Sequence, residues 1–141
     1  MTAFKDIDIN GILPQQPPFR FVRVLESYTP EETVVSFVVG DCLLIEDGHL
    51  CAAGVIEHMA QACAVRVGYI SKYILNLPVK IGFLGQVRKY KLMRLPKVGE
   101  RLETHVRLLQ EVFNITLCEV EVKVDGEVIA RATLKNAIKD D

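Results

Sequence analysis

The chain has 141 residues, which is the size of one domain, residues 1–141, and leaves little room for a second. Half of the residues are hydrophobic and a quarter are charged, as in an ordinary globular domain. Because 17 basic residues balance 18 acidic ones, the composition excludes a strong bulk attraction to nucleic acid or to a membrane surface.

The N-terminus, the apolar stretches and the cysteines all favour a cytoplasmic protein. The first residues show no basic start followed by an apolar run, so we expect no secretory signal. Charged and polar residues interrupt the longest apolar stretch, 51–77, which argues against a membrane span. The cysteines lack Cys-x-x-Cys spacing and a histidine pattern, so we expect reduced, packed thiols with no disulfide, no metal and no cofactor. These residues are Cys42, Cys51, Cys63 and Cys118.

The first block of the chain predicts an irregular opening and then two strands. Three prolines between residues 14 and 18 prevent a regular element there. Strand-like runs follow at residues 19–28 and 33–39, and the turn-rich segment 29–32 separates them.

The second block predicts one long helix over roughly Cys51 to Leu75. The segment contains no proline, is too long for a strand, and is stopped by Pro78. Alanine, glycine and cysteine occur on several of its faces, which is typical of a helix that neighbouring backbone approaches closely from more than one side. We therefore expect this helix to lie in the core.

The third block predicts about four antiparallel strands. Residues 79–93 form the first, residues 101–108 alternate with period two, and residues 118–124 do the same. Asp125-Gly126 then predicts a tight hairpin to residues 128–134. One helix can cover so many strands, each with one solvent-exposed face, only if the sheet curls around it. The expected fold is therefore α+β: a hotdog, an antiparallel sheet wrapped around one central helix.

Two polar side chains stand out on the predicted helix. Glu57 and Gln61 are four residues apart and share a face with small residues. A buried carboxylate must find a partner or remain protonated, and a protonated carboxylic acid near neutral pH is what a general acid requires. The alternative is that Glu57 pairs with an arginine or faces water, and the pattern alone leaves both open.

Several segments resemble the hotdog β-hydroxyacyl-[acyl carrier protein] dehydratases in the same order along the chain. The helix segment IEHMAQA is similar to their central-helix motif, ILPQQPPFRFVRVLE to their opening, RKYKLMRLPKVGERLETHVRL to a later strand pair, and VDGEVIARATL to their last hairpin. More narrowly, LIEDGHLCAAGVIEHMAQACA and GFLGQVRKYKL resemble the branch found with aryl-polyene and flexirubin pigment pathways.

The resemblance implies a mechanism and a set of site residues. In that family a histidine removes the α-proton of a 3-hydroxyacyl thioester while a carboxylic acid protonates the departing hydroxyl, and Glu57 matches the acid. Backbone N–H groups at the helix N-terminus would polarise the thioester carbonyl. We accordingly expect substrate contacts from Gln61, Ala53, Gly54 and Phe83.

The family's catalytic histidine has no match here. Its position, fourteen residues before the acid, is occupied by Leu43, and Gln15 stands where many relatives have a histidine in the opening motif. The nearest substitute is His49, which a helical path would put roughly 12 Å from Glu57, so the two could meet only across a dimer interface. A loop or capping role is the other interpretation of His49.

The other histidines and a basic cluster have plainer interpretations. His58 points about 100° away from Glu57 around the helix, which predicts a role in packing or at a dimer surface. His105 lies on the polar face of a strand and is expected to be solvated. An acyl carrier protein is acidic, so it could be steered by the basic cluster, unless that cluster is an ordinary solvated face. The cluster consists of Arg88, Lys89, Lys91, Arg94 and Lys97.

These observations give three functional hypotheses. The first is a (3R)-hydroxyacyl-[acyl carrier protein] dehydratase, a hydro-lyase in fatty-acid or polyene biosynthesis. The second is a non-catalytic hotdog subunit that binds acyl carrier protein or pairs with an active homologue. The third is a hotdog thioesterase with the helix carboxylate as base or nucleophile. Under all three, we expect a homodimer or a heterodimer with another hotdog chain.

Overall fold

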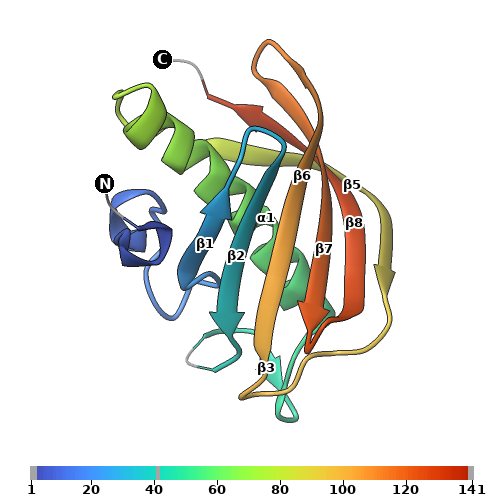
Figure 1. The fold of residues 1–141 in the computed structure, drawn as a ribbon. Helices are drawn as coiled ribbons and strands as arrows, with labels where there is room; N and C mark the ends of the chain where they lie inside the picture. The colour runs from blue at the N-terminus through green and yellow to red at the C-terminus, as the bar shows by residue number, and fades with distance from the viewer. Residues whose placement is uncertain (1–2, 41, 140–141) are drawn as a thin grey trace.

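In a computed structural model, which describes residues 3–40 and 42–139, six antiparallel strands form one sheet that curls around the helix α1 (Figure 1). The strand order is β1-β2-β6-β7-β8-β5, so β1 and β5 are the two edges. This arrangement confirms the predicted α+β class. The strands are β1 (Val24–Tyr28), β2 (Glu32–Val38), β5 (Gly82–Leu92), β6 (Arg101–Val112), β7 (Ile115–Val124) and β8 (Glu127–Ile138).

The central helix confirms the sequence prediction closely. Helix α1 spans Ala52–Tyr69 and continues into one π-helical turn, η3 (Ile70–Ile74). Its small residues let the chain approach from two sides: a side chain at Gly54 would collide with Leu50, and one at Gly68 would collide with the backbone of Ile12. The helix is therefore clamped between the N-terminal segment and the short turn before it, with the sheet against its remaining face.

The period-two strands divide the sheet into an inner apolar face and an outer charged face. Buried inner rows include Leu102 and Val106 on β6 and Val120 and Val122 on β7. The predicted hairpin between β7 and β8 is present, and Asp125 and Gly126 both have the positive φ angles that its tight turn requires.

Three parts of the chain differ from the expectation. Residues 19–23, predicted as strand, are irregular because side chains of α1 take their backbone hydrogen bonds, as described below. A short hairpin, β3 (Ile45–Glu46) with β4 (His49–Leu50), precedes α1 and was not predicted. Two 3₁₀ turns, η1 (Phe4–Asp6) and η2 (Ile9–Gly11), form the N-terminal segment, and η1 lies beside β1.

Two further features concern the helices and the cysteines. None of the helices within residues 3–40 and 42–139 has the length and hydropathy of a membrane-spanning segment. Within the described residues the four cysteines form no disulfide; Cys63 and Cys118 are buried, whereas Cys42 and Cys51 are partly exposed.

Candidate active site

Glu57 lies in the second turn of α1, where Gln61 holds its carboxylate. The Gln61 side-chain amide Nε2 donates a hydrogen bond to Glu57 Oε1 at 2.9 Å. Gln61 is only 1% exposed, while Glu57 is partly exposed. The predicted same-face pair is therefore a direct contact, between a buried amide and a carboxylate that an incoming molecule can reach.

Gln61 is itself fixed by the irregular segment that precedes β1. Its Oε1 accepts from the Phe21 backbone N–H at 2.6 Å, and its Nε2 also donates to the Phe19 carbonyl at 2.8 Å. Both amide hydrogens and the amide oxygen thus have partners. Because Gln61 cannot rotate without breaking these bonds, it holds the Glu57 carboxylate in one orientation.

A cavity of about 190 Å³ opens beside the Glu57 carboxylate. One wall is the face of α1 that carries the predicted small residues, and the opposite wall is formed by the start of β5 and the end of β8. The lining is mainly apolar, which suits an alkyl or acyl chain. It consists of Gln15, Glu57, Ala60, Gln61, Cys63, Ala64, Val67, Gly82, Phe83, Leu84, Asn136 and Ile138.

The structure brings some of the predicted substrate-binding residues together and leaves others apart. Gln61 and Phe83 line the cavity with Glu57, whereas Ala53 and Gly54 do not. Ala53 is exposed in the first turn of α1, and Gly54 is buried against Leu50. In the part of the chain that the structure describes, no side chain caps the N-terminus of α1, so its first-turn N–H groups have no side-chain partner there.

His49 does not join Glu57 within one chain. It lies in β4, where its ring Nδ1 is 2.8 Å from the carbonyl oxygen of Asp47, and its backbone pairs with Lys97. No histidine of the described residues lines the cavity. One chain therefore presents an acid at the cavity without an imidazole beside it.

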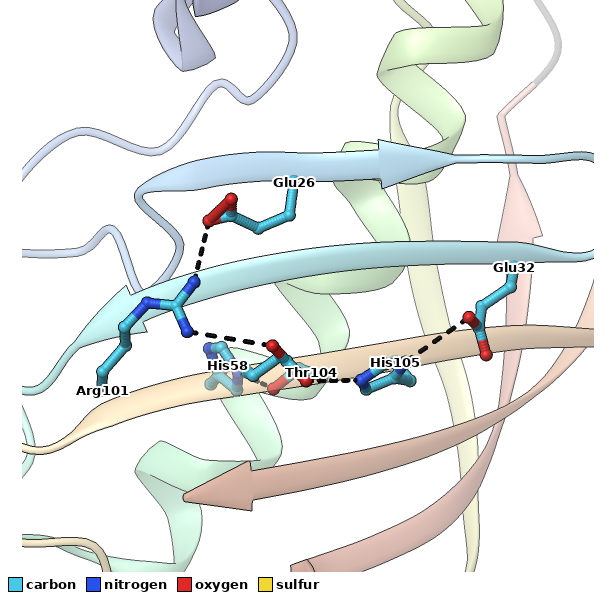
Figure 2. A network of polar contacts seen from close by, with 7 residues as sticks. Glu26, Glu32, His58, Arg101, Thr104 and His105 are labelled. Carbon is cyan, nitrogen blue, oxygen red and sulfur yellow. Dashed lines mark hydrogen bonds and ion pairs between the residues drawn. The ribbon is translucent and has the colours of Figure 1, made fainter. Parts of the chain in front are cut away.

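His58, the next residue after Glu57, has a structural role. It is fully buried, with Nδ1 2.6 Å from the Phe21 carbonyl. Its Nε2 lies 2.6 Å from Thr104 Oγ1 (Figure 2). Burial lowers the pKa of His58 to about 4, and the hydrogen bond to Phe21 opposes this only in part. A neutral imidazole accounts for both contacts: Nδ1–H donates to Phe21, and Nε2 accepts from Thr104. Packing, one of the two roles predicted for His58, is therefore what the structure shows.

His105 lies on the outer face of the sheet, within a chain of charged groups. Its ring contacts Glu103 at 2.9 Å and Glu32 at 3.5 Å, and Arg101 continues the network to Glu26 at 2.9 Å (Figure 2). This network is separated from the cavity by the sheet. Within the described ranges, no group of three histidine, cysteine or acidic side chains is arranged to hold a metal ion.

The predicted basic cluster is split by the structure. Arg88, Lys89 and Lys91 are exposed on the edge strand β5, where Lys89 has a positive φ beside an irregularity in the pairing with β8. Arg94 instead makes a bidentate ion pair with Glu100, with N–O distances of 2.8 and 3.0 Å. This pair lowers the pKa of the Glu100 carboxyl to about 2.

Among the polar residues of the cavity, sequence reasoning missed Asn136 and gave Gln15 no role. Asn136 interrupts the apolar inward row of β8, after Ala130, Ala132 and Leu134. Gln15 was noted only as a departure from the relatives' histidine, yet it lines the cavity. The signal for Asn136 was a polar residue within an alternating apolar row. The tight hairpin fixes the pairing of β8 with β7, and this pairing determines that the residue points inward.

Comparisons with known proteins identify the family of the chain. The family model described as "ApeP-like: ApeP dehydratase" matches residues 7–141. The chain is 26% identical over 143 residues to the 3-hydroxyacyl-[acyl-carrier-protein] dehydratase FabZ of Campylobacter curvus, covering 95% of this chain and 97% of the relative. It is 26% identical over 139 residues to the FabZ of Oleidesulfovibrio alaskensis, covering 92% and 88%.

Solved structures confirm the hotdog fold. The dehydratase heterocomplex ApeI:P from Xenorhabdus doucetiae matches with a TM-score of 0.86 and 21% identity, over 96% of this chain and 93% of that chain. A hypothetical thioesterase from Streptococcus pneumoniae TIGR4, solved with coenzyme A, matches with a TM-score of 0.66 and 14% identity, over 83% and 85%. The structural likeness shows a shared fold, and the family model covers nearly the whole length. The chain belongs to the ApeP-like dehydratase family, as the resemblance to hotdog dehydratases predicted.

Proposed function

We propose that this chain supplies Glu57 as the general acid for dehydration of a (3R)-hydroxyacyl group carried by acyl carrier protein, and that a second hotdog chain supplies the base. The observation that carries the proposal is the oriented Glu57–Gln61 pair at the edge of an apolar cavity. The curated relatives named above act on this kind of thioester, which supports the substrate class.

The reaction divides between the two groups. A base takes a proton from C2 of the acyl group, and the electron pair left behind forms the C2–C3 double bond. The C3–O bond breaks as the Glu57 carboxylic acid donates its proton to the leaving hydroxyl, which departs as water. Gln61 holds the donor oxygen towards C3, and the apolar walls hold the rest of the chain away from solvent.

The missing imidazole supports the role of a second chain. Among the described residues, the cavity has no histidine, and the structurally similar ApeI:P dehydratase is a heterocomplex of two chains. Strand β5 borders the cavity as an unpaired edge, and Ile81, Phe83 and Leu84 are exposed there. A partner that extended the sheet at this edge would cover them and reach the cavity mouth.

The exposed basic residues of β5 support a carrier protein as the bearer of the substrate. Arg88, Lys89 and Lys91 lie on the strand whose first residues line the cavity. An acidic carrier docked on them would deliver its acyl group close to Glu57.

A dehydration assay tests the proposal. The chain is purified with any hotdog chain that accompanies it and given (3R)-hydroxyacyl-[acyl carrier protein], and the enoyl product is followed by absorbance. We expect Glu57→Gln to lower turnover by about 10²–10⁴-fold without unfolding the protein. Glu31→Gln, an exposed carboxylate in the turn before β2, is the matched control and should retain full activity.

The source of the base is read from the same assay. If His49 of a second copy acts, His49→Gln abolishes turnover of the chain alone; if a different hotdog chain supplies the base, only the mixture is active. Unchanged turnover of the assembly with Glu57→Gln would instead make this chain a non-catalytic subunit.

A further inference from the structure

The cavity next to Glu57 contains two buried polar atoms without partners. Among the described residues, only three buried side-chain oxygen or nitrogen atoms lack a hydrogen bond: Gln15 Oε1, Asn136 Nδ2 and Thr33 Oγ1. Two of the three, Gln15 and Asn136, line this cavity. A buried polar group without a partner is costly, so two of them in one apolar pocket indicate a ligand group that satisfies them.

Asn136 is the stronger of the two observations. Its side chain is in the inward row of β8, the residue is only 7% exposed, and Leu84 and Thr116 flank it on the neighbouring strands. Asn136 lies close to the Cys63 sulfur, a weak acceptor, but its amide nitrogen makes no hydrogen bond of normal geometry. An apolar side chain would satisfy the alternation of the strand better, so the amide is not explained by packing.

Asn136 enters the cavity at a distance from Glu57 along α1. The cavity follows α1 from Glu57 to Val67, and Asn136 reaches it beside Cys63. Cys63 is six residues after Glu57, which corresponds to about 9 Å along the helix axis. A group bound by Asn136 therefore belongs to the distal part of an acyl chain whose C3 lies at Glu57.

Gln15 reaches the cavity from the N-terminal segment. The N-terminal segment runs along α1 in the reverse direction, with Ile12 packed on Gly68 and Phe19 bonded to Gln61. Gln15 lies between these two contacts in the chain and lines the cavity, so we place it between Gln61 and Gly68 along α1, on the same side of Glu57 as Asn136. The pocket thus has an amide N–H donor and a carbonyl acceptor in its distal part.

We propose that this distal pocket recognises a hydroxyl group on the acyl chain, with Asn136 as the donor to it and Gln15 as the acceptor from it. The inference rests on the proposed function, because it takes the cavity to hold the acyl group. A hydroxyl both accepts and donates, which matches the two unpaired atoms. An acyl chain that enters the cavity displaces any water that bridges the two amides. A hydroxyl on that chain replaces the hydrogen bonds of the displaced water, whereas a plain alkyl chain leaves both amides unpaired.

Binding of two matched probes tests the inference without requiring turnover. The probes are S-alkyl pantetheine thioethers of equal length, one ending in a methyl group and one carrying a terminal hydroxyl, compared over a short series of lengths by calorimetry. For the full chain with any copurified hotdog partner, we expect the best hydroxylated probe to bind about tenfold more tightly than its alkyl match. Asn136→Leu should abolish or invert the preference, and Gln15→Leu should reduce it.

Thr33→Val is the matched control. It removes the third unpaired buried atom, on β2 and away from the cavity lining, so it should leave the probe preference unchanged. Equal binding of both probes in the native protein, or a preference that persists in Asn136→Leu, would overturn the inference and leave the proposed dehydratase role intact. Failure of both probes to bind would overturn both.

Discussion

Glu57 and His58 are adjacent on α1, yet the fold gives their side chains opposite environments. His58 is buried towards the sheet, with both ring nitrogens bonded. Glu57 faces the cavity, with one hydrogen bond from Gln61 and partial exposure. A titratable group whose hydrogen-bonding capacity is fully used stabilises the fold, whereas one that keeps free lone pairs beside a cavity remains available for chemistry.

The two residues are also joined through one short segment. Phe21 donates its N–H to Gln61 and accepts from His58, while Phe19 accepts from Gln61. Residues 19–21 thus attach the N-terminal segment to both faces of the helix at once. Changes at His58 are expected to appear in stability, and changes at Glu57 in turnover.

The largest expected effect on stability comes from His58→Leu. Removal of the imidazole leaves the Phe21 carbonyl and the Thr104 hydroxyl buried without partners, so we expect a loss of about 3 kcal/mol in the free energy of unfolding. Urea denaturation at neutral pH measures it. His105→Leu is the control, because its contacts are with partly exposed carboxylates and should contribute less than about 1 kcal/mol. Equal losses in the two variants would contradict the structural role of His58.

The lowered pKa of His58 predicts an acid-sensitive fold. His58 is neutral when folded down to about pH 4, but in the unfolded chain it binds a proton below about pH 6.5. Stability is therefore lost as the pH falls from about 6.5 to about 4, by roughly 3 kcal/mol in all, and the loss levels off below. Urea midpoints across this range measure it.

The variant His58→Leu serves as the reference for that measurement. Protonation of depressed carboxyls such as Glu100, whose pKa is about 2, acts mainly at lower pH and affects both proteins alike. A pH dependence in His58→Leu as steep as in the native protein would refute the assignment to this residue.

Substitution of Gln61, which links the two environments, is expected to lower both stability and turnover, each by a smaller amount. Gln61→Met keeps the volume but leaves the Phe21 N–H and the Phe19 carbonyl unpaired, so we expect a loss of about 2 kcal/mol. Because Glu57 also loses its positioning contact, turnover should fall about tenfold. Gln110→Met, at an exposed site on β6, should change neither the urea midpoint nor turnover.

The smallest effect is expected on the outside of β5. Reversing two exposed charges, Arg88→Glu with Lys91→Glu, should raise the KM for the carrier-bound substrate about fivefold at low salt and less at high salt. A pantetheine thioester that lacks the carrier should be turned over as before. Lys5→Glu, in η1 at the opposite edge of the sheet, is the control. A KM that does not respond to the reversal would assign these residues to an ordinary solvated face.

Local patterns in the sequence determined most of the fold. Period-two alternation, the Asp125-Gly126 turn and a proline-free, alanine-rich segment are short-range signals, and the strands and the helix lie where they indicated. The same spacing placed Glu57 and Gln61 on one face of the helix. Residues 19–23 were predicted as strand and are not, because their hydrogen bonds go to side chains some forty residues away.

Only the tertiary structure decided which side of the helix each polar residue meets. The sequence alone could not separate Glu57 from His58 by burial, place Gln15 and Asn136 at one cavity, or pair Arg94 with Glu100 and away from the rest of the basic cluster. These outcomes depend on how the sheet curls and on where the N-terminal segment lies along the helix. Both are set by packing between distant parts of the chain, for which local periodicity carries no signal.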